Sequence, residues 1–84
     1  MITMTLRYTD RFERQYRALS EQLRAKVDKQ IRHLADNLRH PSLRAKKFDE
    51  ARGLWQARVD RRYRFYFEIQ GDTCTLLSVI PHPK

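Results

Sequence analysis

The chain has 84 residues, 40% of them hydrophobic, and a formal net charge of +8 at pH 7. This length allows one domain over residues 1–84 with a limited core. Its one cysteine, Cys74, excludes an internal disulfide and fits a reducing compartment. No apolar stretch approaches the roughly 20 residues that cross a bilayer, and the N-terminus lacks the pattern of a signal peptide. We therefore expect a cytoplasmic protein that does not contact a membrane.

The N-terminal part of the sequence predicts one strand followed by two helices. Residues 2–8 alternate apolar and polar side chains, as in a half-buried strand. Thr9 or Asp10 can cap a first helix, with Glu13 at capping-box spacing from Asp10, and Ser20 can cap a second. The apolar helix faces consist of Phe12, Tyr16 and Leu19 in the first helix, and Leu23, Val27, Ile31, Leu34 and Leu38 in the second.

A loop is expected between the second helix and the remaining strands. His40–Pro41 should end the helix, because the residue before a proline disfavours helical geometry. The loop spans residues 41–53, and its Arg44, Lys46 and Lys47 place positive charge directly before the next strand.

The stretch Leu54–Ile69 is the centre of the predicted fold and has the pattern of two strands joined by a tight turn near Asp60–Arg61. Successive side chains of a strand point to opposite faces of the sheet. One face of this hairpin is therefore apolar, and the other carries arginines. The apolar face contains Trp55, Ala57, Val59, Tyr63, Phe65, Phe67 and Ile69, and the opposite face contains Gln56, Arg58, Arg62, Arg64, Tyr66 and Glu68.

A last strand is predicted over residues 73–80, after a turn at residues 70–72. Both of its faces are fairly apolar, which indicates a position in the middle of the sheet. The predicted fold is α+β, a small two-layer β-α-α-β-β-β domain in which an antiparallel sheet meander carries a helical hairpin on one face. Regular alternation groups Cys74, Leu76, Ser78 and Ile80 on one face of the strand, and Thr75, Leu77 and Val79 on the other.

The positive charge is spread over the chain rather than collected in a tail. Residues 1–42 and residues 43–84 each contain nine lysines and arginines and five aspartates and glutamates. The excess therefore belongs to the folded unit, and it favours a polyanionic partner such as nucleic acid, or an acidic protein. A basic surface that serves only solubility is the alternative.

The arginine face of the hairpin is the main candidate for function. Arg58, Arg61, Arg62 and Arg64 lie within seven residues, and Arg58 and Arg64 share one face. Guanidinium groups bind phosphates bidentately and stabilise the additional negative charge of a phosphorane-like transition state. Tyr66 on the same face could stack on a base of single-stranded RNA.

Two further observations bear on the chemistry. Asp60 and Glu68 lie close to the arginines, so an ion-paired surface is an alternative interpretation. His82 follows the last strand, and an imidazole can transfer a proton near neutral pH, although a terminal histidine is more often simply solvated. No metal or cofactor is expected, because the chain has no zinc-ligand spacing and its two glycines form no phosphate-binding loop.

The ordered segments KKF, GLWQARV, YRFYFEI, GDT and LLSVI, followed by a histidine, resemble the RelE/ParE superfamily of toxins from type II toxin–antitoxin systems. The resemblance covers residues 2–82 and implies a RelE-like fold. In the RelE-like branch, it implies a ribosome-dependent, metal-independent endoribonuclease that cleaves mRNA in the 30S A site. The implied reaction is attack of the ribose 2′-OH on the adjacent phosphate, which leaves a cyclic phosphate and a 5′-OH.

The same resemblance implies roles for particular residues. Arg58 matches a basic strand position of the active site, Arg64 matches the phosphate-binding arginine, and His82 matches the general acid of histidine-containing members. Lys46 and Lys47 match the basic loop that leads to the site. Support for RNA binding is expected from Arg61, Arg62 and Tyr66.

The identity of the general base stays open at this point. Some members of the superfamily carry a glutamate base in the loop, whereas this loop is basic, and Asp49 and Glu50 do not align clearly with that role. A lysine, a carboxylate or the substrate itself are the alternatives.

Two other functions are compatible with the resemblance. A ParE-like toxin would bind DNA gyrase instead of cleaving RNA, and such toxins typically lack the combination of Arg58, Arg64 and His82. The second alternative is a catalytically weak RNA-binding module derived from a toxin. Many relatives continue past the histidine, whereas this sequence stops at Pro83–Lys84. Every toxin interpretation implies a cognate antitoxin with an acidic segment over the basic face or against the helices. DNA operator contact is expected only through that complex.

Overall fold

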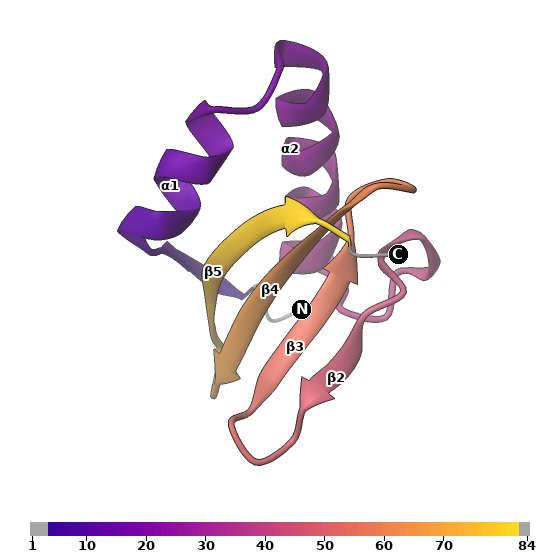
Figure 1. Ribbon diagram of the computed structural model, residues 1–84. Helices are drawn as coiled ribbons and strands as arrows, with labels where there is room; N and C mark the ends of the chain where they lie inside the picture. The colour runs from indigo at the N-terminus through magenta and orange to yellow at the C-terminus, as the bar shows by residue number, and fades with distance from the viewer. Residues whose placement is uncertain (1–3, 83–84) are drawn as a thin grey trace.

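Two helices pack on one side of a mixed sheet in the computed structural model, which describes residues 4–82 (Figure 1). The sheet has five strands in the order β1-β5-β4-β3-β2. The first helix, α1, runs close to β5, whereas β2 lies at the far edge of the sheet. The elements are β1 (Thr5–Tyr8), α1 (Asp10–Arg17), α2 (Glu21–Asp36), the short 3₁₀ helix η1 (Pro41–Leu43), β2 (Lys46–Asp49), β3 (Leu54–Arg58), β4 (Tyr63–Gln70) and β5 (Thr73–Pro81).

The two helices start where side-chain oxygens can cap them. The hydroxyl of Thr9 accepts a hydrogen bond from the backbone N–H of Phe12, and the hydroxyl of Ser20 accepts one from that of Leu23. Of the two predicted caps for α1, Thr9 is therefore the one used. Each bond satisfies an N–H group that the first helical turn leaves without a partner.

The second helix ends at Asp36, four residues earlier than the predicted stop at His40. Asn37 adopts an extended backbone, and its side-chain oxygen accepts a hydrogen bond from the N–H of Arg39 at 3.0 Å. Such a local bond offers the backbone an alternative to the helix, so the helix ends before the proline can act. Leu38 lies outside the helix but still packs against the core.

The sheet differs in two respects from the prediction, in which two helices join the first strand to a three-strand antiparallel meander. First, β1 pairs with β5 in parallel, from Thr5 opposite Thr73 to Tyr8 opposite Leu76. Second, the predicted loop contains the edge strand β2, whose Lys46 pairs with Gln56 of β3. An edge strand is open to water, and lysines on it hinder pairing with other chains. For that reason β2 lacks the apolar alternation by which the other strands were predicted.

The core lies between the helices and the apolar face of the sheet, as the sequence predicted for the hairpin. Within residues 4–82, none of the fully apolar side chains that the central strands place on this face is exposed to solvent, and Cys74 is also buried there. Burial raises the pKa of the Cys74 thiol to about 12, which suits an inert core residue. The buried set is Phe12, Val27, Ile31, Leu34, Leu43, Ala57, Val59, Phe65, Phe67, Cys74, Leu76 and Val79.

A β-bulge in β5 changes which side chains of this strand face the core. Phe67 pairs with Leu76, but Tyr66 pairs with Ser78, so Leu77 is an extra residue. Regular alternation, which grouped Leu76 with Ser78, was therefore wrong beyond this point. The side-chain hydroxyl of Thr9 lies 3.1 and 3.0 Å from the carbonyl oxygens of Leu76 and Leu77 and stabilises the bulge.

None of the helices within residues 4–82 is long and apolar enough to cross a membrane.

Candidate functional site

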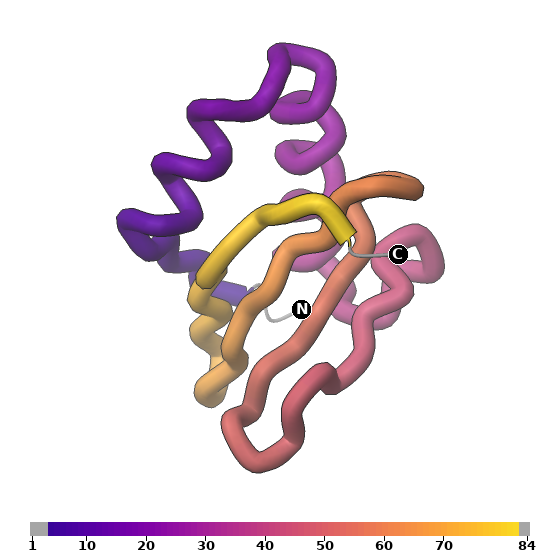
Figure 2. The backbone as a smooth tube through the Cα atoms, in the orientation of Figure 1, coloured from indigo at the N-terminus to yellow at the C-terminus, as the bar shows by residue number. Residues whose placement is uncertain are grey.

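A hollow of about 200 Å³ lies on the face of the sheet opposite the helices, and we call it the basic pocket. Three of the residues predicted for catalysis or RNA binding on β3, β4 and the end of the chain meet in it, and so does Lys46 of β2. The path of the backbone brings the end of β5 toward the segment that precedes β2 (Figure 2). The lining residues are Arg44, Lys46, Gln56, Arg58, Arg64 and His82.

Strand register explains why these side chains converge. Arg58 pairs directly with Arg64 across β3 and β4, and Lys46 pairs with Gln56 across β2 and β3. Directly paired side chains lie on the same face of a sheet. The bulge then brings His82 to this face: Arg64 pairs with Ile80, and His82 follows two residues later. The backbone N–H of His82 donates to the carbonyl oxygen of Arg62, which fixes the end of the strand beside the turn.

The two central arginines are held in different ways. The guanidinium of Arg64 donates hydrogen bonds to the carbonyl oxygens of Asp60 at 2.6 Å and of Tyr63 at 2.9 Å, so the β3–β4 turn orients it. The backbone of Arg58 is fixed instead, because its carbonyl oxygen accepts a bond from the Gln30 amide at 2.8 Å. Its guanidinium remains available to a ligand. The pocket thus combines a guanidinium that the turn orients with one that donates no hydrogen bond within residues 4–82.

The charge of the pocket is not neutralised by nearby carboxylates. Within residues 4–82, the ion pairs are Arg17–Glu13 and Lys26–Asp60, and neither includes a residue that lines the pocket. The interpretation of the arginine face as an ion-paired surface is therefore wrong for Arg58 and Arg64.

The carboxylate nearest in sequence, that of Asp60, serves the turn instead. Burial acts to raise the pKa of Asp60, but backbone N–H groups of Arg62 and Tyr63 and the ammonium of Lys26 outweigh it, and the pKa lies below its usual value. Asp60 is therefore a structural anion that closes the β3–β4 turn.

Of the five residues predicted to bind RNA, only Lys46 lines the basic pocket, and Lys47, Arg61, Arg62 and Tyr66 do not. The ammonium of Lys47 sits 5.9 Å from the centre of the Trp55 ring, and Trp55 packs on the core side of the sheet. Lys47 therefore points away from Lys46, as alternation along β2 requires. Arg61 and Arg62 are exposed in the β3–β4 turn, at the rim of the site rather than inside it.

Tyr66 is on the predicted face but is not open for stacking. It is only 9% exposed, its hydroxyl accepts a hydrogen bond from Gln56 at 3.0 Å, and Phe48 packs edge-on against its ring. The expectation of an accessible Tyr66 ring was wrong, because the unpredicted strand β2 covers it. Phe48, which is 57% exposed, is the accessible aromatic ring in this part of the sheet.

The candidate carboxylate bases are distant from the pocket along the hairpin. Asp49 pairs with Leu54 at one end of β3, whereas Arg58 lies at the other end, and Glu50 belongs to the turn after Asp49. Neither lines the pocket. Two lining residues, Gln56 and Arg44, were not predicted for the site. Gln56 has the same strand parity as Arg58, which could have identified it, but no sequence pattern places Arg44 there.

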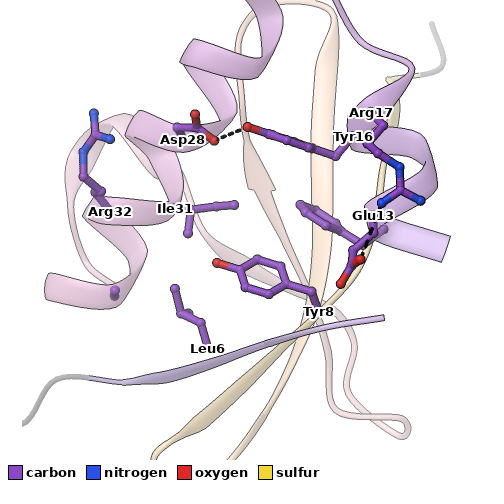
Figure 3. Close-up of a pocket in the computed structure, with 10 residues that line it drawn as sticks. Leu6, Tyr8, Glu13, Tyr16, Arg17, Asp28, Ile31 and Arg32 are labelled. Atoms are coloured by element: carbon purple, nitrogen blue, oxygen red, sulfur yellow. Dashed lines mark hydrogen bonds and ion pairs between the residues drawn. The ribbon is translucent and has the colours of Figure 1, made fainter. Parts of the chain in front are cut away.

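A larger hollow of about 600 Å³, the apolar groove, lies between β1 and the two helices (Figure 3). Its walls include Leu6, Tyr8, Phe12 and Ile31, and Tyr8 is 45% exposed. Four of the polar side chains that line it form two pairs: Tyr16 donates to Asp28 at 2.7 Å, and Arg17 pairs with Glu13 at 3.6 Å. Within residues 4–82, no cluster of three or more histidine, cysteine or acidic side chains could hold a metal ion.

Comparison with known proteins identifies the class of protein to which this chain belongs. The sequence model of the family described as ParE toxin of type II toxin–antitoxin system, parDE, matches residues 6–83. The chain therefore belongs to the ParE toxin family and is a toxin of a type II toxin–antitoxin system. Among curated protein sequences, none matches the chain.

Solved structures share the fold at low sequence identity. A YoeB/ParE toxin from Agrobacterium tumefaciens is 16% identical, with 95% of this chain and 100% of that chain covered and a TM-score of 0.78. YafQ from E. coli strain BL21(DE3) is 12% identical, with coverages of 94% and 93% and a TM-score of 0.79. The archaeal RelE–RelB complex from Pyrococcus horikoshii OT3 is matched at 13% identity, with coverages of 94% and 94% and a TM-score of 0.79. The predicted RelE-like fold is thus confirmed.

Proposed function

We propose that this toxin is a metal-independent endoribonuclease that cleaves mRNA in the ribosomal A site. The basic pocket is the observation that supports this proposal, because cationic side chains and a histidine meet there without a carboxylate among the lining residues. Its volume of about 200 Å³ is below the roughly 300 Å³ at which sites for whole small molecules begin. A pocket of that size suits one phosphate group of a longer strand.

In the proposed reaction, Arg58 and Arg64 bind the non-bridging oxygens of the scissile phosphate and stabilise the charge that grows on them. The ribose 2′-oxygen attacks phosphorus, and the bond from phosphorus to the 5′-oxygen breaks. His82 donates a proton to the departing 5′-oxygen. The products are a 2′,3′-cyclic phosphate and a 5′-OH, so no water is consumed.

The proton of the 2′-OH needs an acceptor, and we assign this role to the side chain of Lys46. Lys46 lines the pocket, whereas Asp49 and Glu50 do not. Of the alternatives left by the sequence, a lysine base therefore has the better support.

Purified toxin added to ribosomes with a defined mRNA in the A site tests this proposal. Primer extension should detect A-site cleavage by the natural protein, and Arg58→Gln should lower the rate about 100-fold or more, since it removes a charge that the transition state needs. Arg58 is a cleaner target than Arg64, whose guanidinium also holds the turn. Exposed Arg11 on α1 gives the control variant Arg11→Gln. Equal cleavage by Arg58→Gln and Arg11→Gln would contradict the assigned site.

A gyrase-directed toxin is the second candidate, because the matching family model is described as ParE toxin, whereas the solved structures that share the fold include YafQ and RelE. In that case induction of the toxin should produce gyrase-trapped DNA breaks, and programmed ribosomes should keep their mRNA intact. Measuring both outcomes in the same cells decides between the two targets.

We also propose a cognate antitoxin as the partner of this cytoplasmic toxin. The DinJ–YafQ structure from E. coli, 10% identical to this chain, is a toxin–antitoxin complex, and the RelE structure was solved with RelB. An acidic antitoxin segment would complement the unneutralised charge of the basic pocket. Association should therefore slow markedly between 0.05 and about 0.5 M salt in stopped-flow measurements, and a salt-independent rate would exclude this electrostatic attraction.

A further inference from the structure

A second basic hollow of about 500 Å³ adjoins the basic pocket, and we call it the α2 hollow. Arg44 and Arg58 line both cavities, so their side chains form a shared wall. On the far side of that wall, α2 contributes Lys26 and Lys29. The two cavities and their common arginine wall form a mainly cationic surface, which we call the track and which also includes Asp60 of the α2 hollow.

The base of the α2 hollow is rigid and its polar groups are satisfied. The amide of the buried Gln30 donates to the carbonyl oxygens of Ser42 at 3.1 Å and Arg58 at 2.8 Å, and it accepts from the Ser42 hydroxyl at 3.2 Å. This network joins α2, η1 and β3. The groups of the hollow that have no internal partner are therefore charged side chains, not backbone groups.

The cations of the α2 hollow are only partly compensated. Lys26 pairs with Asp60 at 3.3 Å. Within residues 4–82, the arginine side chains that donate hydrogen bonds are those of Arg24 and Arg64, so the guanidinium groups of Arg44 and Arg58 bind no protein acceptor. Lys29 likewise takes part in neither ion pair of the described chain. Three cations therefore face this track without a counterion.

Arg44 occupies a backbone conformation that disfavours its side chain. Its φ is 46° and its ψ is 42°, in the left-handed region, and within residues 4–82 the other positive φ angles belong to Gly53 and Gly71. A residue with a Cβ atom is strained in this region, and such strain is concentrated at functional positions. The chain thus keeps an arginine where glycine would be the less strained choice.

We propose that the α2 hollow is a second phosphate-binding subsite, which holds the backbone phosphate adjacent to the one in the basic pocket, so that a single strand of RNA crosses the wall of Arg44 and Arg58. This inference rests on the proposed function for the identity of the strand. The recognised chemistry is the phosphodiester, and Lys29 and Arg44 are binding residues of the subsite.

Salt-dependent binding of a fluorescent 2′-O-methyl octanucleotide, which cannot be cleaved, tests the subsite in the full chain. Each phosphate contact contributes about 0.7 to the slope of log affinity against log salt for a single strand. Lys29→Gln should lower this slope by about 0.7 and the affinity about fivefold at 0.1 M salt. Arg44→Gly should lower both at least as much, while its Tm stays equal or rises, because glycine relieves the strained backbone. Arg14→Gln on α1 is the charge-matched control and should leave the slope unchanged.

The outcomes separate this subsite from the nuclease proposal. If Lys29→Gln and Arg44→Gly bind as Arg14→Gln does, or if the natural protein does not bind the octanucleotide, the subsite is excluded whatever the cleavage assay shows. If the two variants lose slope but ribosome-bound mRNA stays intact, the subsite stands and the proposed reaction fails. A lower Tm for Arg44→Gly together with an unchanged salt slope would show that Arg44 is kept for structure, and would overturn its role in binding.

Discussion

The apolar groove and the basic pocket differ in what their polar groups do. The groove is three times as large, at about 600 against 200 Å³, and most of its charged side chains pair internally, through Tyr16–Asp28 and Arg17–Glu13, with Arg32 as the exception within residues 4–82. The pocket is small, and within residues 4–82 the charges of Arg44 and Arg58 have no counterion. Internally paired groups stabilise a fold, whereas unpaired cations lower stability by mutual repulsion and so need another reason to be there. Cavity size alone would have selected the groove, whereas the unpaired charge selects the basic pocket.

Thr9 links the two regions, and replacing it should have the largest effect on the fold. Its hydroxyl caps α1 beside the groove and also holds the β5 bulge that brings His82 to the pocket. Thr9→Val should lower the free energy of unfolding by about 2 kcal/mol. It should also reduce cleavage, since the bulge loses its support. Urea denaturation and the ribosome assay measure the two effects, and Thr9→Ser should restore both. A Thr9→Val variant with full activity would show that the bulge does not depend on the hydroxyl.

Tyr16→Phe should separate the groove from the pocket. The change removes the hydrogen bond to Asp28, which is also the main reason that the pKa of Tyr16 is raised. We expect a loss of about 1 kcal/mol in unfolding free energy and unchanged cleavage. Arg58→Gln should show the opposite pattern, with cleavage lost and stability retained. If Tyr16→Phe impaired cleavage at constant stability, the groove would belong to the active site.

The pH dependence of stability tests whether Asp60, in the turn beside the pocket, acts as a structural anion and not as part of the site. Because the folded-state pKa of Asp60 lies below its usual value near 3.8, its ionised form stabilises the fold above that pH. This contribution is lost as the pH falls through the lower folded-state value. Asp60→Asn should therefore flatten the fall in Tm below about pH 4. An unchanged acid profile in this variant would contradict the role of the anion.

The smallest effect is expected for the stacked imidazoles of His33 and His40, whose ring centres lie 3.7 Å apart before the segment that carries Arg44. Burial first, and then His40, Lys29 and Arg32, lower the pKa of His33 below 6.5. The unfolded chain therefore binds the proton more readily than the folded chain does. As a result, the free energy of unfolding decreases as the pH falls below about 6.5. His33→Asn should reduce the difference in Tm between pH 5 and pH 7, and a larger difference would refute this assignment.

The hairpin shows how much of the fold and of the candidate site could be predicted from the sequence alone. Alternation assigned the core face of β3 and β4 correctly and put Arg58 and Arg64 on the same open face, because a half-buried strand must alternate. It failed for β2, whose polar composition reflects its place at the edge of the sheet. That failure also led to the wrong expectation for Tyr66, since Phe48 of β2 covers this ring.

What the sequence by itself determined was therefore the α+β class, a helix cap at Thr9 or Asp10 and another at Ser20, the apolar face of the hairpin and the basic character of the opposite face. These follow from interactions between near neighbours in the chain. The tertiary structure alone decided whether His82 joins the arginines. Regular alternation from the buried Leu76 would turn His82 toward the helices, and the extra residue Leu77 reverses that direction. A bulge exists only in the pairing of two strands, and Thr9, far away in sequence, supports it.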